Sequence, residues 1–80
     1  MTLTTQDARA LVGDALLRIV PDADLDALPD DAAFRDELEL DSLDFLSFVE
    51  FLSAGAHRRI DEDDYPRLRT MAGCIAFLSA

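Results

Sequence analysis

The ten residues from Leu43 to Leu52 constrain the fold more than any other part of the chain. Seven of the ten are apolar, which is more than the single buried stripe of a surface helix requires. A helix that is apolar on most of its sides either lies at the centre of a fold or carries an exposed binding face. The run therefore predicts a helix of one of these two kinds.

The residues around this run indicate where the helix begins and ends. Asp41 can act as the N-cap, and Asp44 stands three residues later, as in a capping box with aspartate in place of glutamate. We expect the helix to begin at Asp41 or Ser42 and to run to about Ala54, with Gly55 closing it.

Two further helices are predicted on either side of this one. The first begins at Thr4 or Thr5, where a hydroxyl can cap it, and stops before Pro21. Apolar residues recur along it at helical spacing: Ala8, Leu11, Val12, Ala15, Leu16 and Ile19. The last helix begins at about Thr70. Its expected apolar face comprises Met71, Ile75 and Leu78, with Cys74 and Phe77 beside that face.

The segments between these helices are expected to contact the core. Residues 21–41 form a connection of about twenty residues, which would be unusual in a small domain if it had no structure. Its apolar side chains can pin it down, and a short helical turn is expected near residues 32–38. These side chains are Leu25, Leu28, Phe34, Leu38 and Leu40. In "IDEDDYPRL", residues 60–68, the acids and Pro66 predict another short turn of helix.

No stretch of useful length alternates between apolar and polar residues, so no strand is predicted. We therefore expect an all-α fold, a small bundle of three main helices and one short third helix. A long loop joins the first and second helices in this arrangement. The eighty residues are expected to form one domain, residues 1–80.

Charge is the strongest compositional signal. Seven arginines and no lysine stand against seventeen acids, which gives a net charge of −10. Phosphate backbones repel such a chain, so nucleic-acid binding is not expected, whereas basic protein surfaces attract it. Ten of the acids fall between Asp22 and Asp44, where Arg35 is the sole basic residue. A charge run is usually a solvated loop, but its position directly ahead of Ser42 weakens that interpretation here.

Nothing in the sequence points to a membrane or to an oxidising compartment. There is no basic segment followed by an apolar leader, and no apolar run of eighteen residues. The single cysteine, Cys74, cannot form an internal disulfide and matches no zinc pattern. In its expected helix it is a small core residue rather than a reactive thiol. We expect a monomeric, cytoplasmic protein.

The serine hydrolases are excluded by spacing. Their nucleophile needs a base within hydrogen-bond reach. The only histidine, His57, lies fifteen residues from Ser42, which is about 20 Å along a helix. His57 is therefore expected to be a surface residue, and no catalytic residue is predicted.

Calcium binding of the EF-hand type is excluded in the same way. A loop that starts at Asp22 would need glycine and glutamate where Ala27 and Ala33 stand. A loop that starts at Asp61 has Pro66 at the glycine position. No metal site is predicted.

Ser42 itself has two interpretations. At the first turn of a helix its hydroxyl is exposed, and an attached phosphate would face free backbone N–H groups and the positive end of the helix dipole. That position suits a modified serine better than a nucleophilic one. From local physics alone, however, Asp-Ser before an apolar run is more often simply the start of a helix.

The chain as a whole resembles the acyl carrier proteins and peptidyl carrier domains. "ELELDSLDFL", residues 37–46, is similar to the D-S-L motif of that family. "IDEDDYPRLRTM", residues 60–71, resembles its acidic third-helix segment, which leads through a threonine into the last helix. The spacing from Ser42 to Ile60 and on to Thr70 aligns without a gap. The resemblance extends from the first helix to "CIAFLSA".

The resemblance implies a four-helix bundle that carries 4′-phosphopantetheine on Ser42 through a phosphodiester. A phosphopantetheinyl transferase would install the arm from coenzyme A with Mg²⁺, and an acyltransferase or ligase would load its thiol with an acyl or aminoacyl group. The protein would be a shuttle between enzymes such as a ketosynthase, and not itself an enzyme. Partners with basic docking surfaces are expected to contact Asp41, Leu43, Asp44, Phe45, Leu46, Glu62 and Asp63.

The resemblance leaves the pathway open. The leading expectation is an acyl carrier of fatty-acid, polyketide or related specialised biosynthesis. One alternative is an aminoacyl or peptidyl carrier of non-ribosomal peptide biosynthesis. Another, from a different class, is a helical interaction module without a prosthetic group.

Several residues depart from the family's pattern. The family often has glycine or alanine where Glu39 stands. Acids of its second helix are replaced by Ser47, Ser53 and Ala54. Phe45, at a commonly small or polar position, either adds an apolar contact or folds onto the bundle. Glu50 falls where an apolar residue usually lines the acyl space, and a carboxylate there would be costly unless paired or exposed. These departures favour a specialised carrier with a short, polar or aminoacyl cargo.

Overall fold

The computed structural model describes residues 3–79, and every regular element in this range is a helix. The α-helices are α1 (Thr5–Ile19), α2 (Phe34–Glu37), α3 (Ser42–Ala56) and α4 (Met71–Leu78). Two 3-10 helices, η1 (Leu25–Ala27) and η2 (Glu62–Leu68), lie in the connections. The prediction of an all-α fold is confirmed.

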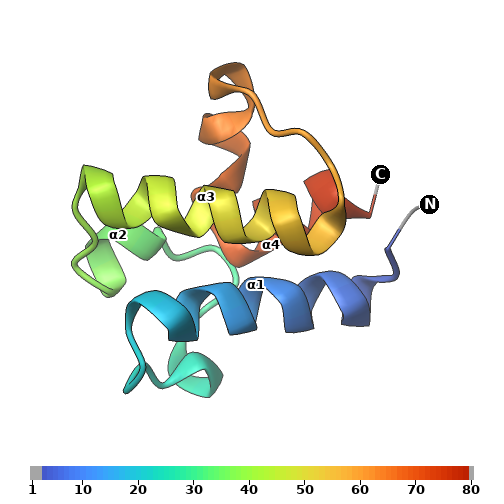
Figure 1. Ribbon diagram of the computed structural model, residues 1–80. Coiled ribbons are helices and arrows are strands. Elements are labelled where there is room, and N and C mark those ends of the chain that lie inside the picture. The colour runs from blue at the N-terminus through green and yellow to red at the C-terminus, as the bar shows by residue number, and fades with distance from the viewer. Residues whose placement is uncertain (1–2, 80) are drawn as a thin grey trace.

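Helices α1 and α3 lie side by side and run in opposite directions (Figure 1). The Oγ1 of Thr4 accepts a hydrogen bond from the N–H of Asp7 at 3.1 Å, which confirms the predicted cap of α1. The buried side of α1 is formed by Ala8, Val12, Ala15 and Leu16. It meets the buried side of α3, formed by Phe45, Phe48, Val49 and Leu52. The rings of Phe34 and Phe48 pack edge to face at a centroid distance of 5.4 Å.

Helix α4 is almost entirely enclosed. Its buried residues are Met71, Cys74, Ile75, Phe77 and Leu78. Thr70 caps it, because its Oγ1 accepts from the N–H of Gly73 at 3.0 Å. Cys74 and Phe77, expected beside the apolar face, are both within the core, because α1 and η2 contact this helix.

The connection between α1 and α2 is pinned to the helices, as predicted. Its Leu25 and Leu28 are half-buried against the core. Asp30 anchors it at two points, since its carboxylate accepts two hydrogen bonds from Arg9, at 3.0 and 2.8 Å, and its carbonyl accepts from the N–H of Ala72 at 3.0 Å. The hydrogen bonds from Arg9 lower the pKa of the Asp30 carboxyl.

The end of α3 differs from the prediction. The helix continues through Gly55 to Ala56, and His57 takes the left-handed conformation that closes it, with a φ of 52°. Gly55 instead makes room for α1, because the side chain of Leu11 lies where a Cβ at Gly55 would be. The predicted closing glycine is therefore wrong, and Gly55 is a point of close approach between α1 and α3.

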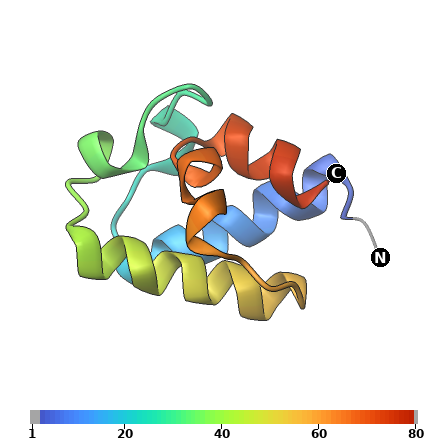
Figure 2. The ribbon, with the colours of Figure 1, turned by 90° about the horizontal axis from the view of Figure 1, so that it is seen from above.

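The two ends of the described chain lie together, far from the start of α3. In two perpendicular views, the beginning of α1 and the end of α4 are at one end of the molecule, and the first turn of α3 is at the other (Figures 1 and 2). Within residues 3–79, no helix has the length and apolar character needed to cross a membrane.

Candidate functional site

Ser42 is the first residue of α3 and is exposed. The predicted capping box is formed around it. The Oδ1 of Asp41 accepts from the N–H of Asp44 at 2.8 Å, and the Oδ2 of Asp44 accepts from the N–H of Asp41 at 3.5 Å. The two aspartates therefore fix the first turn of the helix, and the hydroxyl between them is not needed as its cap.

The capping box also determines which backbone donors remain at the helix start. The first turn of a helix has four N–H groups without an intrahelical partner. The box satisfies those of Asp41 and Asp44. The other two belong to Ser42 and Leu43, so they lie next to the exposed hydroxyl.

A tight turn leads into this site. The N–H of Leu40 donates to the carbonyl of Arg35 at 3.1 Å, and the Leu40 side chain is buried. Glu39, between them, has a φ of 53°, a left-handed conformation that glycine adopts without strain. The turn folds the chain back on α2, so that Arg35 and Ser42 come together.

Arg35 contacts Ser42 directly. Its Nη2 donates a long hydrogen bond to the Oγ of Ser42 at 3.5 Å. In residues 3–79, the ion pairs join Arg9 to Asp30 and Arg59 to Asp61, and Arg35 forms none, although it lies in the most acidic part of the chain.

Two surface hollows meet at Arg35. The first, the α2 hollow, is lined by Ala33, Arg35, Asp36, Leu40 and Arg69. The second, the η2 hollow, is lined by Arg35, Phe45, Glu62, Asp63, Tyr65, Pro66 and Arg69. Thus Glu62 and Asp63, which the resemblance suggested as recognition residues, lie on the same side of the molecule as Arg35 and its contact with Ser42.

The apolar residues of the motif divide into exposed and buried ones. Leu43 is 73% exposed and Leu46 is 41% exposed, so both are accessible to a partner. Phe45 is only 8% exposed, and its ring lies edge-on to that of Tyr65, with 5.8 Å between the centroids. This burial corrects the expectation of a Phe45 side chain available for docking, because η2 covers it. Asp41 is exposed and Asp44 is half-buried.

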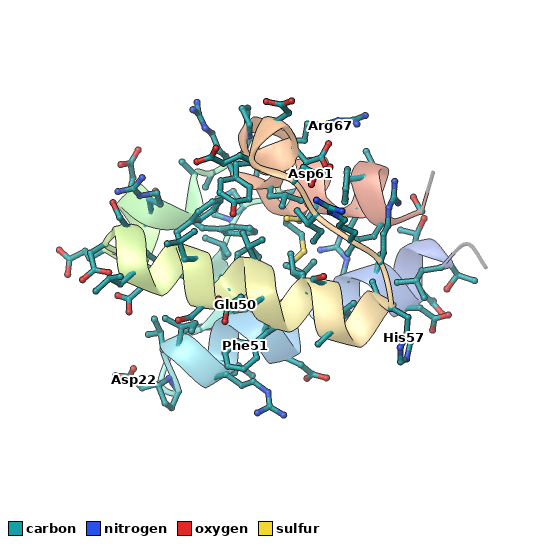
Figure 3. The ribbon with its side chains drawn as sticks, turned by 45° about the horizontal axis from the view of Figure 1, so that its top comes forward. Asp22, Glu50, Phe51, His57, Asp61 and Arg67 are labelled. Carbon is teal, nitrogen blue, oxygen red and sulfur yellow. The ribbon has the colours of Figure 1, made fainter. Side chains whose placement is uncertain are left out.

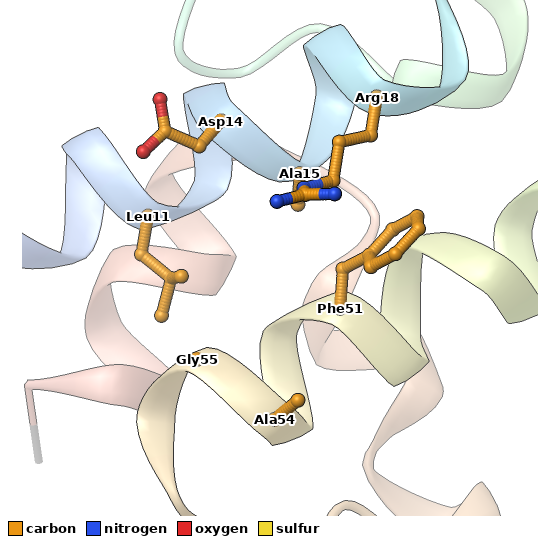
Figure 4. Close-up of a pocket in the computed structure, with 7 residues that line it drawn as sticks. All are labelled: Leu11, Asp14, Ala15, Arg18, Phe51, Ala54 and Gly55. Atoms are coloured by element: carbon orange, nitrogen blue, oxygen red, sulfur yellow. The ribbon is translucent and has the colours of Figure 1, made fainter.

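Beyond the first turn, the outer side of α3 carries Glu50 and Phe51 (Figure 3). Glu50 is exposed, so its carboxylate remains in water and gives no argument about an apolar cargo. Phe51 is 36% exposed and lies beneath the guanidinium of Arg18, whose Cζ is 5.2 Å from the ring centroid. Arg18 from α1 and Phe51 from α3 meet across a groove between the two helices, and Leu11 points toward Gly55 farther along it (Figure 4).

The single histidine and the single cysteine of the chain do not lie at the Ser42 hydroxyl. His57 is at the far end of α3 (Figure 3), as predicted from the spacing. Within residues 3–79, there is no group of three histidine, cysteine, aspartate or glutamate side chains placed to hold a metal ion. The thiol of Cys74 is buried and donates to the carbonyl of Leu68 at 3.5 Å, and burial raises its pKa to about 12.

The sequence interpretation missed Arg35, Arg69 and Tyr65 as members of the site. Arg35 had a visible signal, since it is the one cation among ten acids. Arg69 and Tyr65 had none, because they reach the site only through the packing of η2 and of the turn before α4.

No family model matches the chain, and no curated protein matches its sequence.

Proposed function

We propose that this protein is an acyl carrier that holds its cargo as a thioester on a 4′-phosphopantetheine arm attached to Ser42. The single observation that carries the proposal is the exposed hydroxyl at the first turn of α3, set within the Asp-Ser-Leu-Asp sequence. In the corresponding four-helix arrangement, α1, α3 and α4 are the main helices and η2 is the short third one.

The residues at this position fit the linkage of the arm. A phosphodiester on the Ser42 Oγ would lie beside the N–H groups of Ser42 and Leu43 and at the positive end of the α3 dipole. The guanidinium of Arg35 adds further donors on the other side. When bound, the arm supplies a terminal thiol to which an acyl group is esterified.

The turn before the motif also agrees with the family pattern. Carriers often have glycine or alanine where Glu39 stands, and Glu39 has the left-handed backbone that favours glycine. Glycine, one of the two residues common there, would take this conformation without strain. This supports the alignment on which the resemblance rests.

The surroundings of Ser42 suit recognition by basic partner enzymes. Leu43 and Leu46 present apolar surface next to the carboxylates of Asp41 and Asp44, and Glu62 and Asp63 line the η2 hollow with Arg35. An apolar centre with a charged rim is a common form of transient interface, and the charges speed association with a basic surface. The partners proposed are a phosphopantetheinyl transferase, a loading acyltransferase or ligase, and an acyl-processing enzyme such as a ketosynthase.

The cargo class is a narrower proposal. Fatty-acyl or polyketide-type intermediates remain the leading choice, and an aminoacyl or peptidyl cargo is the alternative. Glu50 does not discriminate between them, because it is exposed. The loading enzyme, rather than the interior of this helical fold, is therefore expected to select the cargo.

A second candidate function has an observation of its own. Leu43, Leu46 and Phe51 are exposed on α3, and such a face can bind a partner without any prosthetic group. In that case Ser42 is a surface residue at a helix start and nothing more.

Intact-mass measurement distinguishes the two. The purified protein is incubated with coenzyme A, Mg²⁺ and a broad-specificity phosphopantetheinyl transferase. We expect a mass increase of one phosphopantetheine on the wild type and on Ser47→Ala, a serine control on the same helix, and none on Ser42→Ala. No addition to the wild type, or addition that persists in Ser42→Ala, would contradict the carrier proposal.

A further inference from the structure

We infer that Arg35 binds the phosphodiester on Ser42 and fixes the direction in which the arm leaves the protein. The inference rests on the proposed function, because it requires a phosphodiester at Ser42. It assigns to a particular side chain of this protein the role of positioning the arm.

The placement of Arg35 is set by the backbone on both of its sides. Phe34, which precedes it, is fully buried, and its N–H donates to the carbonyl of Arg69 at 2.9 Å. The bond from the N–H of Leu40 to the carbonyl of Arg35 closes the turn that follows. Arg35 therefore stands on an anchored segment, and its Nη2 is 3.5 Å from the Oγ of Ser42, the atom that would be esterified.

Arg35 is also free to take an anionic ligand. Among residues 3–79 it has no carboxylate within ion-pair distance, whereas Arg9 and Arg59 each pair with an aspartate. Its one side-chain hydrogen bond in that range is the long one to Ser42. Guanidinium groups bind phosphate oxygens through two parallel N–H donors, so a phosphodiester offers a better partner than the hydroxyl does.

The carboxylates at the helix start favour such a partner. A phosphodiester adds a negative charge between the carboxylates of Asp41 and Asp44, which repel it. Arg35 is the cation that touches this position, and Arg69 lines the same α2 hollow. Of the charged side chains that line the α2 hollow, two are guanidinium groups and one, that of Asp36, is a carboxylate.

The test compares three loaded proteins: the wild type, Arg35→Gln and Arg59→Gln. Arg59 is a matched control because it is exposed and pairs with Asp61, in the loop that follows α3. Each protein is converted to the holo form with excess transferase, checked by intact mass, and examined by ³¹P NMR and by thermal denaturation of the apo and holo forms. The expected result is a displaced ³¹P resonance in Arg35→Gln and an unchanged one in Arg59→Gln.

Stability gives the second readout. Loading should lower the melting temperature of Arg35→Gln by a few degrees, because the phosphodiester then faces Asp41 and Asp44 without its cation. Loading should leave the melting temperatures of the wild type and Arg59→Gln nearly unchanged. Arg35→Lys, which keeps the charge but not the paired donors, should fall between.

The outcomes separate this inference from the proposed function. If the wild type takes up no phosphopantetheine at Ser42, the carrier proposal fails and this inference fails with it. If all proteins load at Ser42 but the ³¹P resonance and the effect of loading on melting are the same in Arg35→Gln and Arg59→Gln, the carrier proposal stands and the role of Arg35 is overturned.

Discussion

Helices α3 and α4 are both strongly apolar, but they meet solvent in different ways. In α4, every large apolar side chain is buried: Met71, Cys74, Ile75, Phe77 and Leu78. In α3, four apolar side chains are buried, while Leu43, Leu46 and Phe51 remain exposed. Two strongly apolar segments thus form different helices: α4 is enclosed in the core, whereas α3 has one buried side and one exposed side.

The difference indicates which large apolar side chains are not needed to fill the core. The exposed side chains of α4 are small, those of Ala72 and Ala76, so that helix leaves little apolar surface in water. The large side chains that α3 leaves exposed contribute less to folding than fully buried ones do. One of them, Leu43, follows directly after Ser42, and Leu46 comes three residues after Leu43. This is the contrast expected if α3 is a surface for partners and α4 supports it from within.

The sharpest test of the contrast uses two phenylalanines of α3. Phe48 is fully buried against Phe34, so Phe48→Ala should lower the free energy of unfolding by about 3–5 kcal/mol. Phe51 is 36% exposed, and Phe51→Ala should cost less, about 1–2 kcal/mol, because only part of its ring is buried. Urea denaturation followed by circular dichroism measures both. Equal losses would show that the two sides of α3 are equally involved in the core.

Two glycines provide the next test. A Cβ at Gly73 in α4 would clash with the carbonyl oxygen of Arg67, which is backbone and cannot easily move, so Gly73→Ala should cost about 1–3 kcal/mol. At Gly55 in α3 the obstacle is the end of the Leu11 side chain. There the gain in helix propensity offsets the shift of Leu11, and Gly55→Ala should stay within about 1 kcal/mol of the wild type. Thermal denaturation of both variants checks the pair, and a larger loss at Gly55 would contradict it.

The burial of Cys74 in α4 predicts that the free energy of unfolding depends on pH. Burial raises the pKa of Cys74 from 9.0 to about 12, so the folded protein holds this proton more tightly than the unfolded chain does. The resulting stability is fully present below pH 9 and is lost as the pH rises from there toward 12. The loss should approach about 1.4 kcal/mol per pH unit. Denaturation curves of the wild type and Cys74→Ala, recorded between about pH 8 and 10.5, measure this loss of stability. A slope that persists in Cys74→Ala would have another origin.

The smallest effect is expected on the outer side of α3. Leu43 is 73% exposed, so Leu43→Ala should change the free energy of unfolding by no more than about 0.5 kcal/mol. Leu78→Ala in α4, where the side chain is buried, should cost about 2–5 kcal/mol as the matched comparison. Denaturant titration of the two variants decides whether Leu43 is retained for something other than stability.

Local chemistry was sufficient to predict where helices begin. Thr4, Asp41 and Thr70 each accept a hydrogen bond from the N–H three residues later. The sequence predicts helix starts at Thr4 or Thr5, at Asp41 or Ser42, and at about Thr70. These contacts involve neighbours in the chain, so they do not depend on the rest of the fold. The same holds for the capping box that leaves the Ser42 hydroxyl exposed.

Contacts between distant residues explain what could not be predicted. α3 continues past Gly55 to Ala56, and Arg58, two residues farther, is held by α4: its Nη1 donates to the carbonyl of Phe77 at 2.7 Å, and its guanidinium lies over the Phe77 ring. Phe45 is buried because Tyr65 of η2 covers it. Helical spacing alone carries no information about either contact.

The enclosure of Cys74 has a consequence for acyl transfer. It is the only cysteine of the chain, and its high pKa keeps it protonated at neutral pH. A thioester exchanges with thiolates, so the protein's own sulfur cannot take an activated acyl group from a neighbouring arm. In a carrier loaded at Ser42, each folded molecule would then present one sulfur to a thiol reagent, that of the arm. The count of rapidly reacting thiols would report directly on how much of the protein is loaded and unacylated.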